Sequence, residues 1–326
     1  MKIRKKSSLY EMCGNPNRDI LANSPELLFM SAICAKDIEK AASLFCEKKL
    51  FGNEPVAVDA PNGRFTGLSG VRTFAGKWLD LFHAQSAYVT PVFQTRANGR
   101  SVTELVVNFV VDGEINQVSM FVVGDLRVAG KVDEIRIYFH YTYAYGLTGY
   151  RRPIFRSSHL EMGEPGLLTG AVREYYEALH HVPAVDVDRI IGSMGANCKF
   201  GGYEPDGGKP MMEISREELR KIYENMAAYI PKWVGMRYET IVDDGVNCVI
   251  EWVHIVTKEG QEKGARVCIS GISSYERGED GLLCSIRISD YAGFERQIDW
   301  SKTPISKAEA MSINLVDSFP PYKFQK

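Results

Sequence analysis

The sequence predicts an α+β protein built from two tandem domains of one plan, each with three helices followed by an antiparallel-rich sheet. Three observations predict this. The chain has 326 residues, about twice the length of a typical domain. Short segments recur at a spacing near 150 residues. Each copy places its helical segments before its strand-like segments without βαβ alternation, which favours an α+β fold.

The internal repeat rests on four pairs of matching segments that follow the same order in both copies. Their spacings lie between 147 and 151 residues. The pairs are Asp37-Ile38-Glu39 with Asp186-Val187-Asp188, Phe51-Gly52 with Phe200-Gly201, Glu104-Leu105-Val106 with Glu251-Trp252-Val253, and Ile135-Arg136-Ile137 with Ile286-Arg287-Ile288. A period of this length indicates a duplicated domain, because solenoid units are only ~20–50 residues long.

In the first copy, Ser24-Pro25 predicts the start of a helix over 26–35, since a cap residue precedes Pro at the first helical position. Asp37 caps a second helix over 38–45, and helical spacing of apolar residues predicts a third over 67–82. Segments rich in Val, Ile, Phe and Tyr predict strands over 88–96, 101–111, 115–123 and 132–143.

The second copy repeats this order. Helices are predicted over 171–181 and, after the cap Asp186, over 187–194. The capping box from Ser215 to Glu218 opens the third helix. Strands are predicted over 233–242, 247–257, 264–275 and 282–290.

Domain boundaries follow from the Gly and Pro content around the copies. The predicted units are a first domain over 1–144, a linker over 145–168, a second domain over 169–300 and a C-terminal tail over 301–326.

Composition excludes several classes of protein. Lys plus Arg number 39 against 41 Asp plus Glu, a net charge of −2, which argues against a nucleic-acid-binding surface. Apolar residues at 45% exclude a disordered chain. The seven cysteines include no CxxC pair, so reduced thiols in a cytoplasmic protein are the simplest interpretation. No secretory signal or membrane-spanning segment is expected.

The chain resembles the nuclear transport factor 2-like fold, and within it the SnoaL-like and ketosteroid-isomerase-like branch. The resemblance rests on the two Asp-aliphatic-acidic helix starts, on the Ile-Arg-Ile strands and on the segment from Phe65 to Phe74, and it covers 20–142 and 169–298. It implies two cone-shaped domains, each with three helices packed in a curved, mixed, mostly antiparallel sheet around an apolar pocket. It also implies an intrachain pseudo-dimer, and it leaves open a further homodimer.

The resemblance implies two classes of function. The first is a cofactor-independent enzyme, an isomerase, dehydratase or cyclase, that moves protons on a small apolar oxygenated substrate of steroid, bile-acid or polyketide type. The second is a non-catalytic protein of the same fold that binds a small molecule or serves as a scaffold. The full isomerase set is absent from both copies, since Phe29 replaces the helix-1 Tyr in the first and Ser119 and Arg266 replace the acidic donor.

The first-domain site expected from the sequence consists of His140, Tyr138 and Asp59. Strand alternation places Tyr138 and His140 on one face, opposite Ile137 and Phe139. A histidine with an ordinary pKa near ~6.5 suits proton transfer, a phenol can polarise a carbonyl, and Asp59 supplies a carboxylate.

The second-domain candidates are Tyr176, His254, Glu204 and Asp290. Tyr176 corresponds to the helix-1 Tyr of the resembled isomerases, and Asp290 ends the last strand near the catalytic Asp of some SnoaL-like members. No metal or cofactor is expected, because ligand spacings and phosphate-binding glycine motifs are missing. The repeated Arg136 and Arg287 fit either a structural ion pair or a substrate anchor.

Overall fold

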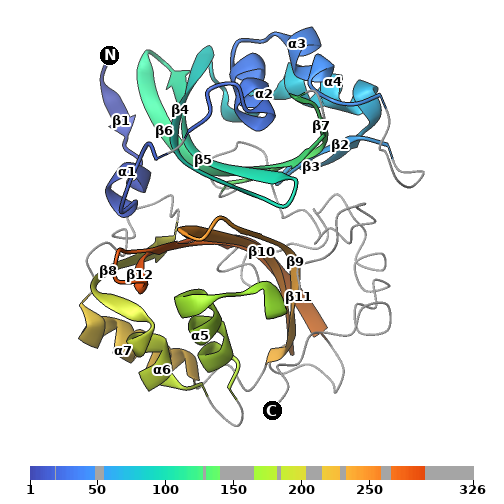
Figure 1. Ribbon diagram of the computed structural model, residues 1–326. Helices are drawn as coiled ribbons and strands as arrows, with labels where there is room; N and C mark the ends of the chain where they lie inside the picture. Colours follow the sequence, from blue (N-terminus) through green and yellow to red (C-terminus); the bar gives the residue numbers. More distant parts are fainter. Residues whose placement is uncertain are drawn as a thin grey trace.

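The computed structural model describes residues 1–18, 20–47, 55–127, 130–139, 165–181, 185–202, 215–227, 233–257 and 266–290. Within these residues the chain forms a seven-stranded sheet in its first half (1–139) and a five-stranded sheet in its second half (165–290). Figure 1 shows the main helices of each half on one face of its sheet, while the opposite faces of the two sheets are turned toward each other. The predicted α+β fold with two similar halves is confirmed.

The first half joins three packed helices to a sheet of strand order β3-β2-β7-β6-β5-β4, with β1 added to β6. Its elements are β1 (Ile3–Lys5), α1 (Leu9–Met12), α2 (Pro25–Cys34), α3 (Ile38–Ser43), β2 (Ala57–Ala60), β3 (Gly63–Thr66), α4 (Gly67–Lys77), η1 (Asp80–Phe82), β4 (Ser86–Ala97), β5 (Arg100–Val111), β6 (Glu114–Leu126) and β7 (Val132–Tyr138). The pairs β1·β6 and β2·β7 are parallel and the others antiparallel, so the sheet is mixed as predicted.

The second half repeats this plan with strand order β8-β12-β11-β10-β9. Its elements are η4 (Pro165–Leu167), α5 (Gly170–Leu179), α6 (Val187–Gly192), β8 (Met194–Gly202), α7 (Arg216–Ala227), β9 (Trp233–Asp243), β10 (Asn247–Thr257), β11 (Arg266–Arg277) and β12 (Leu283–Asp290). Only β8·β12 is parallel.

Local signals in the sequence set the ends of these elements. Asp37 caps α3 by accepting the backbone N–H of Lys40 at 3.0 Å, and Asp186 caps α6 by accepting that of Arg189 at 3.1 Å. The turn between β4 and β5 has φ values of 51° at Asn98 and 73° at Gly99. A two-residue type I′ hairpin needs such left-handed values at both positions.

Several elements were not predicted, and their composition explains why. β2 and β3 have four residues each, too few for a clear period-two pattern. β8 contains three glycines, which have low strand propensity. It begins at Met194, so α6 ends at Gly192 and does not fill the predicted 187–194. The predicted strand over 132–143 runs to Tyr138, and residues 140–143 lie outside the described residues.

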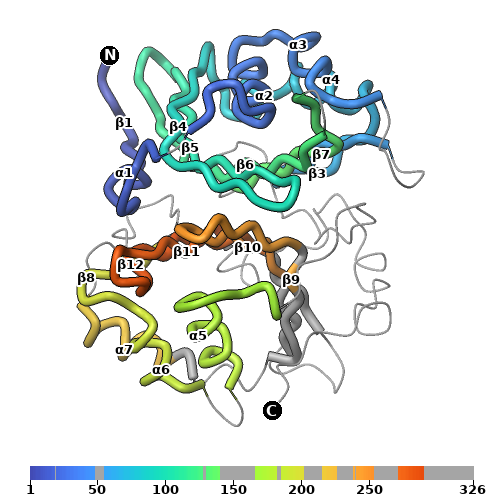
Figure 2. The backbone as a smooth tube through the Cα atoms, in the orientation of Figure 1, coloured from blue at the N-terminus to red at the C-terminus, as the bar shows by residue number. Residues whose placement is uncertain are grey.

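Three apolar clusters fill the molecule. One lies between α2–α4 and the first sheet, and a second lies between α5–α7 and the second sheet. The third joins the two sheets and combines Phe93, Val106 and Phe121 with Val249 and Ile272. Figure 2 shows β5 and β6 lying above β10 and β11 at this contact. We call it the intersheet cluster.

A buried arginine from the first half crosses this contact. Arg136 of β7 donates to Glu251 of β10 from Nε at 2.8 Å and from Nη2 at 2.9 Å. It also donates to Asp125 of β6 at 3.0 Å. All three side chains are at most 1% exposed. We call Arg136, Asp125 and Glu251 the first triad.

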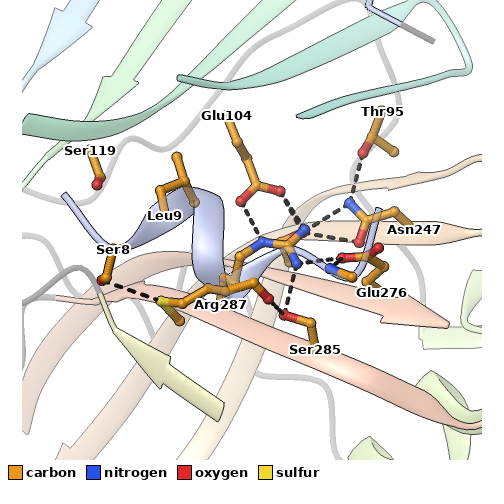
Figure 3. Close-up of polar contacts among 12 residues, drawn as sticks. Ser8, Leu9, Thr95, Glu104, Ser119, Asn247, Glu276, Ser285 and Arg287 are labelled. Carbon is orange, nitrogen blue, oxygen red and sulfur yellow. Dashed lines mark hydrogen bonds and ion pairs between the residues drawn. The ribbon is translucent and has the colours of Figure 1, made fainter. Parts of the chain in front are cut away.

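The second half supplies the counterpart. Arg287 of β12 donates to Glu104 of β5 at 2.7 and 2.9 Å and to Glu276 of β11 at 2.7 Å. We call these three residues the second triad (Figure 3). In both triads the arginine follows the carboxylate of its own half by 11 residues. The repeated arginines therefore form ion pairs, and each takes one carboxylate from the opposite half.

Candidate functional site

Tyr138 lies on the face of β7 that meets the second half. Ile135, Ile137 and Phe139 pack in the first-half core, whereas Tyr138 belongs to the intersheet cluster. Its hydroxyl donates to Glu251 Oε1 at 2.6 Å. The predicted alternation along this strand is correct, but it directs Tyr138 away from the first-half interior and toward the first triad.

Asp59 also lies outside that interior. Its neighbours Val58 and Ala60 pack in the first-half core, while the Asp59 carboxylate accepts from Arg64 Nη1 at 3.2 Å. Arg64 in addition makes two 3.0 Å bonds to Glu134. Tyr138 and Asp59 therefore do not line a first-half pocket as expected, because both belong to the charged face of the sheet. His140 lies outside the described residues.

Tyr176 lies in the interior of the second half. Helix α5 turns Val172, Tyr175, Tyr176 and Leu179 toward the sheet, at the spacing that forms one helix face. Tyr176 is 2% exposed, and its hydroxyl lies 2.6 Å from the hydroxyl of Tyr275 on β11. The structure thus pairs this predicted residue with a second phenol that the sequence did not single out.

Further tyrosines complete a cluster around this pair. The hydroxyls of Tyr175 and Tyr223, the latter from α7, lie 2.9 Å apart. The ring of Tyr238 from β9 meets Tyr176 edge-to-face at 5.5 Å. Edge-to-face contacts of this kind add to the energy of burial. We call Tyr175, Tyr176, Tyr223, Tyr238 and Tyr275 the tyrosine cluster.

Burial sets the protonation of the tyrosine cluster. It raises the pKa of Tyr175 to about 12 and the pKa of Tyr176, Tyr223, Tyr238 and Tyr275 well above the ordinary value. A phenol in an apolar interior resists ionisation because the phenolate would lose its hydration. All five side chains are therefore neutral hydrogen-bond donors at neutral pH.

His180 adds a neutral imidazole beside Tyr176. The two rings stack with their centroids 6.0 Å apart, and burial lowers the pKa of His180 to about 4. Its Nδ1 lies 2.9 Å from the backbone carbonyl oxygen of Tyr176. Since a carbonyl only accepts, Nδ1 carries the proton and Nε2 is the basic nitrogen.

The other second-half candidates are described by their backbone alone or lie outside the described residues. His254 is on β10, opposite Ile269 and Met236, two residues beyond the buried Trp252. Asp290 ends β12 opposite Gly271 of β11. Glu204 follows β8 and lies outside the described residues.

The sequence contained a partial signal for the tyrosine cluster. Tyr223 follows the apolar Leu219 at helical spacing, and Tyr275 ends a strand-like run. Such positions indicate core residues of any kind, so no pattern along the chain distinguishes a structural tyrosine from one of a hydroxyl pair.

A separate cleft of about 470 Å³ opens on the outer surface of the second half. Its lining comes from the segment between α5 and α6, the first turn of α6, and α7, and includes His181, Asp186 and Glu224. Asp188 and Arg220 at its edge form a 2.6 Å ion pair. None of the five residues of the tyrosine cluster lines this cleft.

Comparisons with known proteins bear on the fold alone. No protein-family model and no curated protein matches the chain. Among solved structures, a protein from Kribbella flavida is 14% identical over 38% of this chain and 91% of its own, with a TM-score of 0.29. An NTF2-like protein of unknown function from Cytophaga hutchinsonii is 13% identical over 38% and 93%, with a TM-score of 0.27. An NTF2-like protein from Anabaena variabilis is 17% identical over 34% and 81%, with a TM-score of 0.29.

The order of elements and the mixed, unclosed sheets give each half an α+β fold, in keeping with the fold that the sequence resembles. This fold accommodates both enzymes and binding proteins, so the function has to be argued from the site. In the part of the chain that the structure describes, no helix has the length and apolar character needed to cross a membrane.

Proposed function

We propose that the protein is a cofactor-independent enzyme whose active site lies in the second half. Its substrate is a small, largely apolar, oxygenated molecule of steroid, bile-acid or polyketide type, and its reaction is an isomerisation, dehydration or cyclisation. One observation carries this proposal, the buried hydroxyl pair of Tyr176 and Tyr275 in the interior of the second half. The proposal moves the expected site from the first half to the second.

The phenol pair suits the acid side of such a reaction. A neutral phenol donates to a carbonyl or hydroxyl oxygen, and its donation strengthens when it accepts a hydrogen bond from a second phenol. In a water-excluded interior, a fixed donor stabilises the negative charge that develops on the substrate oxygen. Tyr176 or Tyr275 would hold that oxygen while a base removes a proton from the adjacent carbon.

The base of this reaction would be one of the other candidate side chains of the second half. Glu204 and Asp290 offer carboxylates, and His254 offers an imidazole with an ordinary reference pKa near ~6.5. His180 is a weaker candidate, because burial lowers its pKa to about 4. We therefore give His180 the role of orienting the Tyr176 ring.

The test compares two buried hydroxyl pairs of the same interior. Tyr176→Phe and Tyr275→Phe are expected to lower turnover of the best ketone in a steroid and polyketide panel by about 10²–10³-fold. Tyr175→Phe removes a hydroxyl from the neighbouring pair and serves as the matched control, with an expected change below about tenfold. Products are followed by mass spectrometry. Full turnover in Tyr176→Phe together with Tyr275→Phe would overturn the site.

A non-catalytic protein that binds a small molecule is the second candidate. It is favoured by the hydroxyl pairs of the tyrosine cluster, because in the described part of the chain they join phenol to phenol and not phenol to carboxylate. Ligand that binds to the wild-type protein and returns unchanged would support this candidate and overturn the enzyme. Ligand that fails to bind anywhere in the panel would count against both.

We further propose that the two halves are separate domains, 1–144 and 169–300, joined by a linker over 145–168 and followed by a tail over 301–326. They would pair within the chain as a pseudo-dimer. The reciprocal sharing of carboxylates by the two triads supports this, because a two-fold pair makes each contact twice. The described cysteines are free thiols, which suits a cytoplasmic location.

A further inference from the structure

In each triad, one carboxylate comes from the same half as the arginine, namely Asp125 or Glu276. The two triads differ in the further donor that this carboxylate binds. In the first half, Asp125 lies opposite Arg100 in the sheet and accepts from its Nε at 3.1 Å. In the second half, the residue opposite Glu276 is Asn247. The amide of Asn247 donates to Thr95 at 2.7 Å and to Ser274 at 2.8 Å (Figure 3). The second triad therefore lacks the equivalent of Arg100.

Two backbone amides from the N-terminal segment bind Glu276 in the way that Arg100 binds Asp125. The N–H groups of Gly14 and Asn15 donate to the Glu276 carboxylate at 3.0 and 2.8 Å. Two consecutive amides form a local positive site for a carboxylate, as they do in other anion-binding turns. The carboxylate is 1% exposed, so loss of these donors would leave it with a large desolvation cost.

The same segment makes further polar contacts with the second half. The backbone oxygen of Met12 accepts from Ser285 Oγ at 2.6 Å, and that of Glu11 accepts from Lys199 Nζ at 2.6 Å. Arg18 forms a 3.1 Å ion pair with Asp244.

Contacts with the first half anchor both ends of the segment. Ser7 donates its N–H to Gln117 at 3.0 Å and shares a 2.5 Å hydroxyl contact with Ser119. At the other end, the N–H of Asn17 donates to the backbone oxygen of Val92 at 2.6 Å. Between these anchors, Leu9 and Cys13 are buried in the intersheet cluster.

The position of Gly14 shows how closely the segment approaches the triad. A Cβ atom at this residue would lie 2.9 Å from Glu276 Oε1 and 3.1 Å from Cys284 Sγ. A side chain here would force the two amides away from the carboxylate. The close approach of Gly14 to the Glu276 carboxylate therefore favours a residue without a side chain at this position.

We propose that residues 7–18 are a clasp that replaces the missing arginine of the second triad and holds the two sheets together. The surface around Glu276, Ser285, Lys199 and Asp244 is a docking site for a peptide that presents two consecutive backbone amides to the Glu276 carboxylate. Its occupant is the protein's own N-terminal segment. The inference rests on the contacts of this segment and is independent of the proposed enzyme activity.

Hydrogen exchange on the full chain tests the clasp. In Glu276→Ala, backbone amides in 9–18 are expected to exchange at least tenfold faster than in the wild type. The matched control is Asp125→Ala, which removes the equivalent carboxylate of the first triad and is expected to leave exchange in 9–18 within about twofold. Exchange is measured by mass spectrometry on peptic fragments, with circular dichroism to check folding.

A second variant covers the case in which Glu276→Ala fails to fold. Gly14→Ala leaves the residues of both triads unchanged and is expected to release the same segment, because its Cβ would clash with the Glu276 carboxylate. Unchanged exchange in 9–18 in Gly14→Ala, or equal acceleration in Asp125→Ala and Glu276→Ala, would overturn the proposal.

Discussion

The interiors of the two halves share a backbone plan and differ in their polar atoms. The first is filled by rings without hydroxyl groups, namely Phe29, Phe45, Phe74, Trp78, Phe82, Phe109 and Phe139. The second contains the tyrosine cluster. In the first, Phe82 and Phe109 stack at 4.0 Å, whereas in the second Tyr176 and Tyr275 bring two hydroxyls within 2.6 Å.

The two halves therefore resemble each other more closely in the ion pairs that join them than in the side chains that fill their interiors. Glu104 and Glu251, like Arg136 and Arg287, are identical in type and reciprocal in contact. A buried ion pair is costly to alter on one side, because the remaining charge is left without a partner. An interior can change from phenylalanine to tyrosine more easily, provided that each new hydroxyl finds a hydrogen-bond partner.

The largest expected effect comes from breaking the two triads one at a time. Arg136→Met and Arg287→Met each leave two buried carboxylates without their shared cation. Each is expected to lower the free energy of unfolding by about 3–5 kcal/mol in urea denaturation. Arg287→Met should cost more, because Arg100 still places a positive charge beside Asp125, whereas Glu276 keeps only the backbone amides of Gly14 and Asn15.

The matched control for these variants is Arg72→Met on α4. Its partner Glu39 is exposed, so water screens the ion pair and the loss is expected to be far smaller than for either buried arginine. Losses below about 1 kcal/mol for both buried arginines would contradict the view that the triads hold the halves together.

A smaller expected effect is a pH dependence of stability that comes from His180 in the second half. Burial holds the pKa of His180 at about 4, against 6.5 when it is unfolded. At pH values above 6.5 the residue is neutral in both states and has no effect. As the pH falls from 6.5 to 4, the unfolded chain takes up the proton first, so the folded state loses roughly 2–3 kcal/mol of stability.

His180→Gln removes this pH dependence. The difference in stability between wild type and variant therefore separates the contribution of His180 from that of the other titratable groups. The measurement is the free energy of unfolding at pH 7.5 and at pH 4.5. Parallel stability curves for wild type and variant would show that His180 is not held neutral. In the first half, the histidine that the structure describes is His83, which is exposed, so no such loss is expected there.

The smallest expected effect compares the repeated helix caps. Asp37→Ala and Asp186→Ala each remove one side-chain acceptor from a backbone N–H at 3.0–3.1 Å. Each should cost about 1 kcal/mol in thermal or urea unfolding. The two losses should agree within about 0.5 kcal/mol, because the caps are equivalent; a larger gap would mean that the two helices depend differently on their surroundings.

Much of the fold was predictable because it depends on short-range signals. The caps, the Asn-Gly turn and the apolar periodicities act within a few residues, and they located the main helices and long strands. β2, β3 and β8 escaped prediction because they are short or glycine-rich. Of the candidate site, Tyr176 on α5 was found from a family resemblance, whereas Tyr275 on β11 and Tyr238 on β9 were not, because their positions indicate only core residues.

By itself, the sequence determined that the chain is an α+β protein with two halves of one plan and that Tyr138 lies opposite Ile137 on one strand. Only the tertiary structure decided what each face meets. Alternation along a strand fixes relative directions of side chains, but the docking of two sheets fixes their partners. Glu104 and Arg287 are 183 residues apart in sequence, and no period along the chain could have paired them.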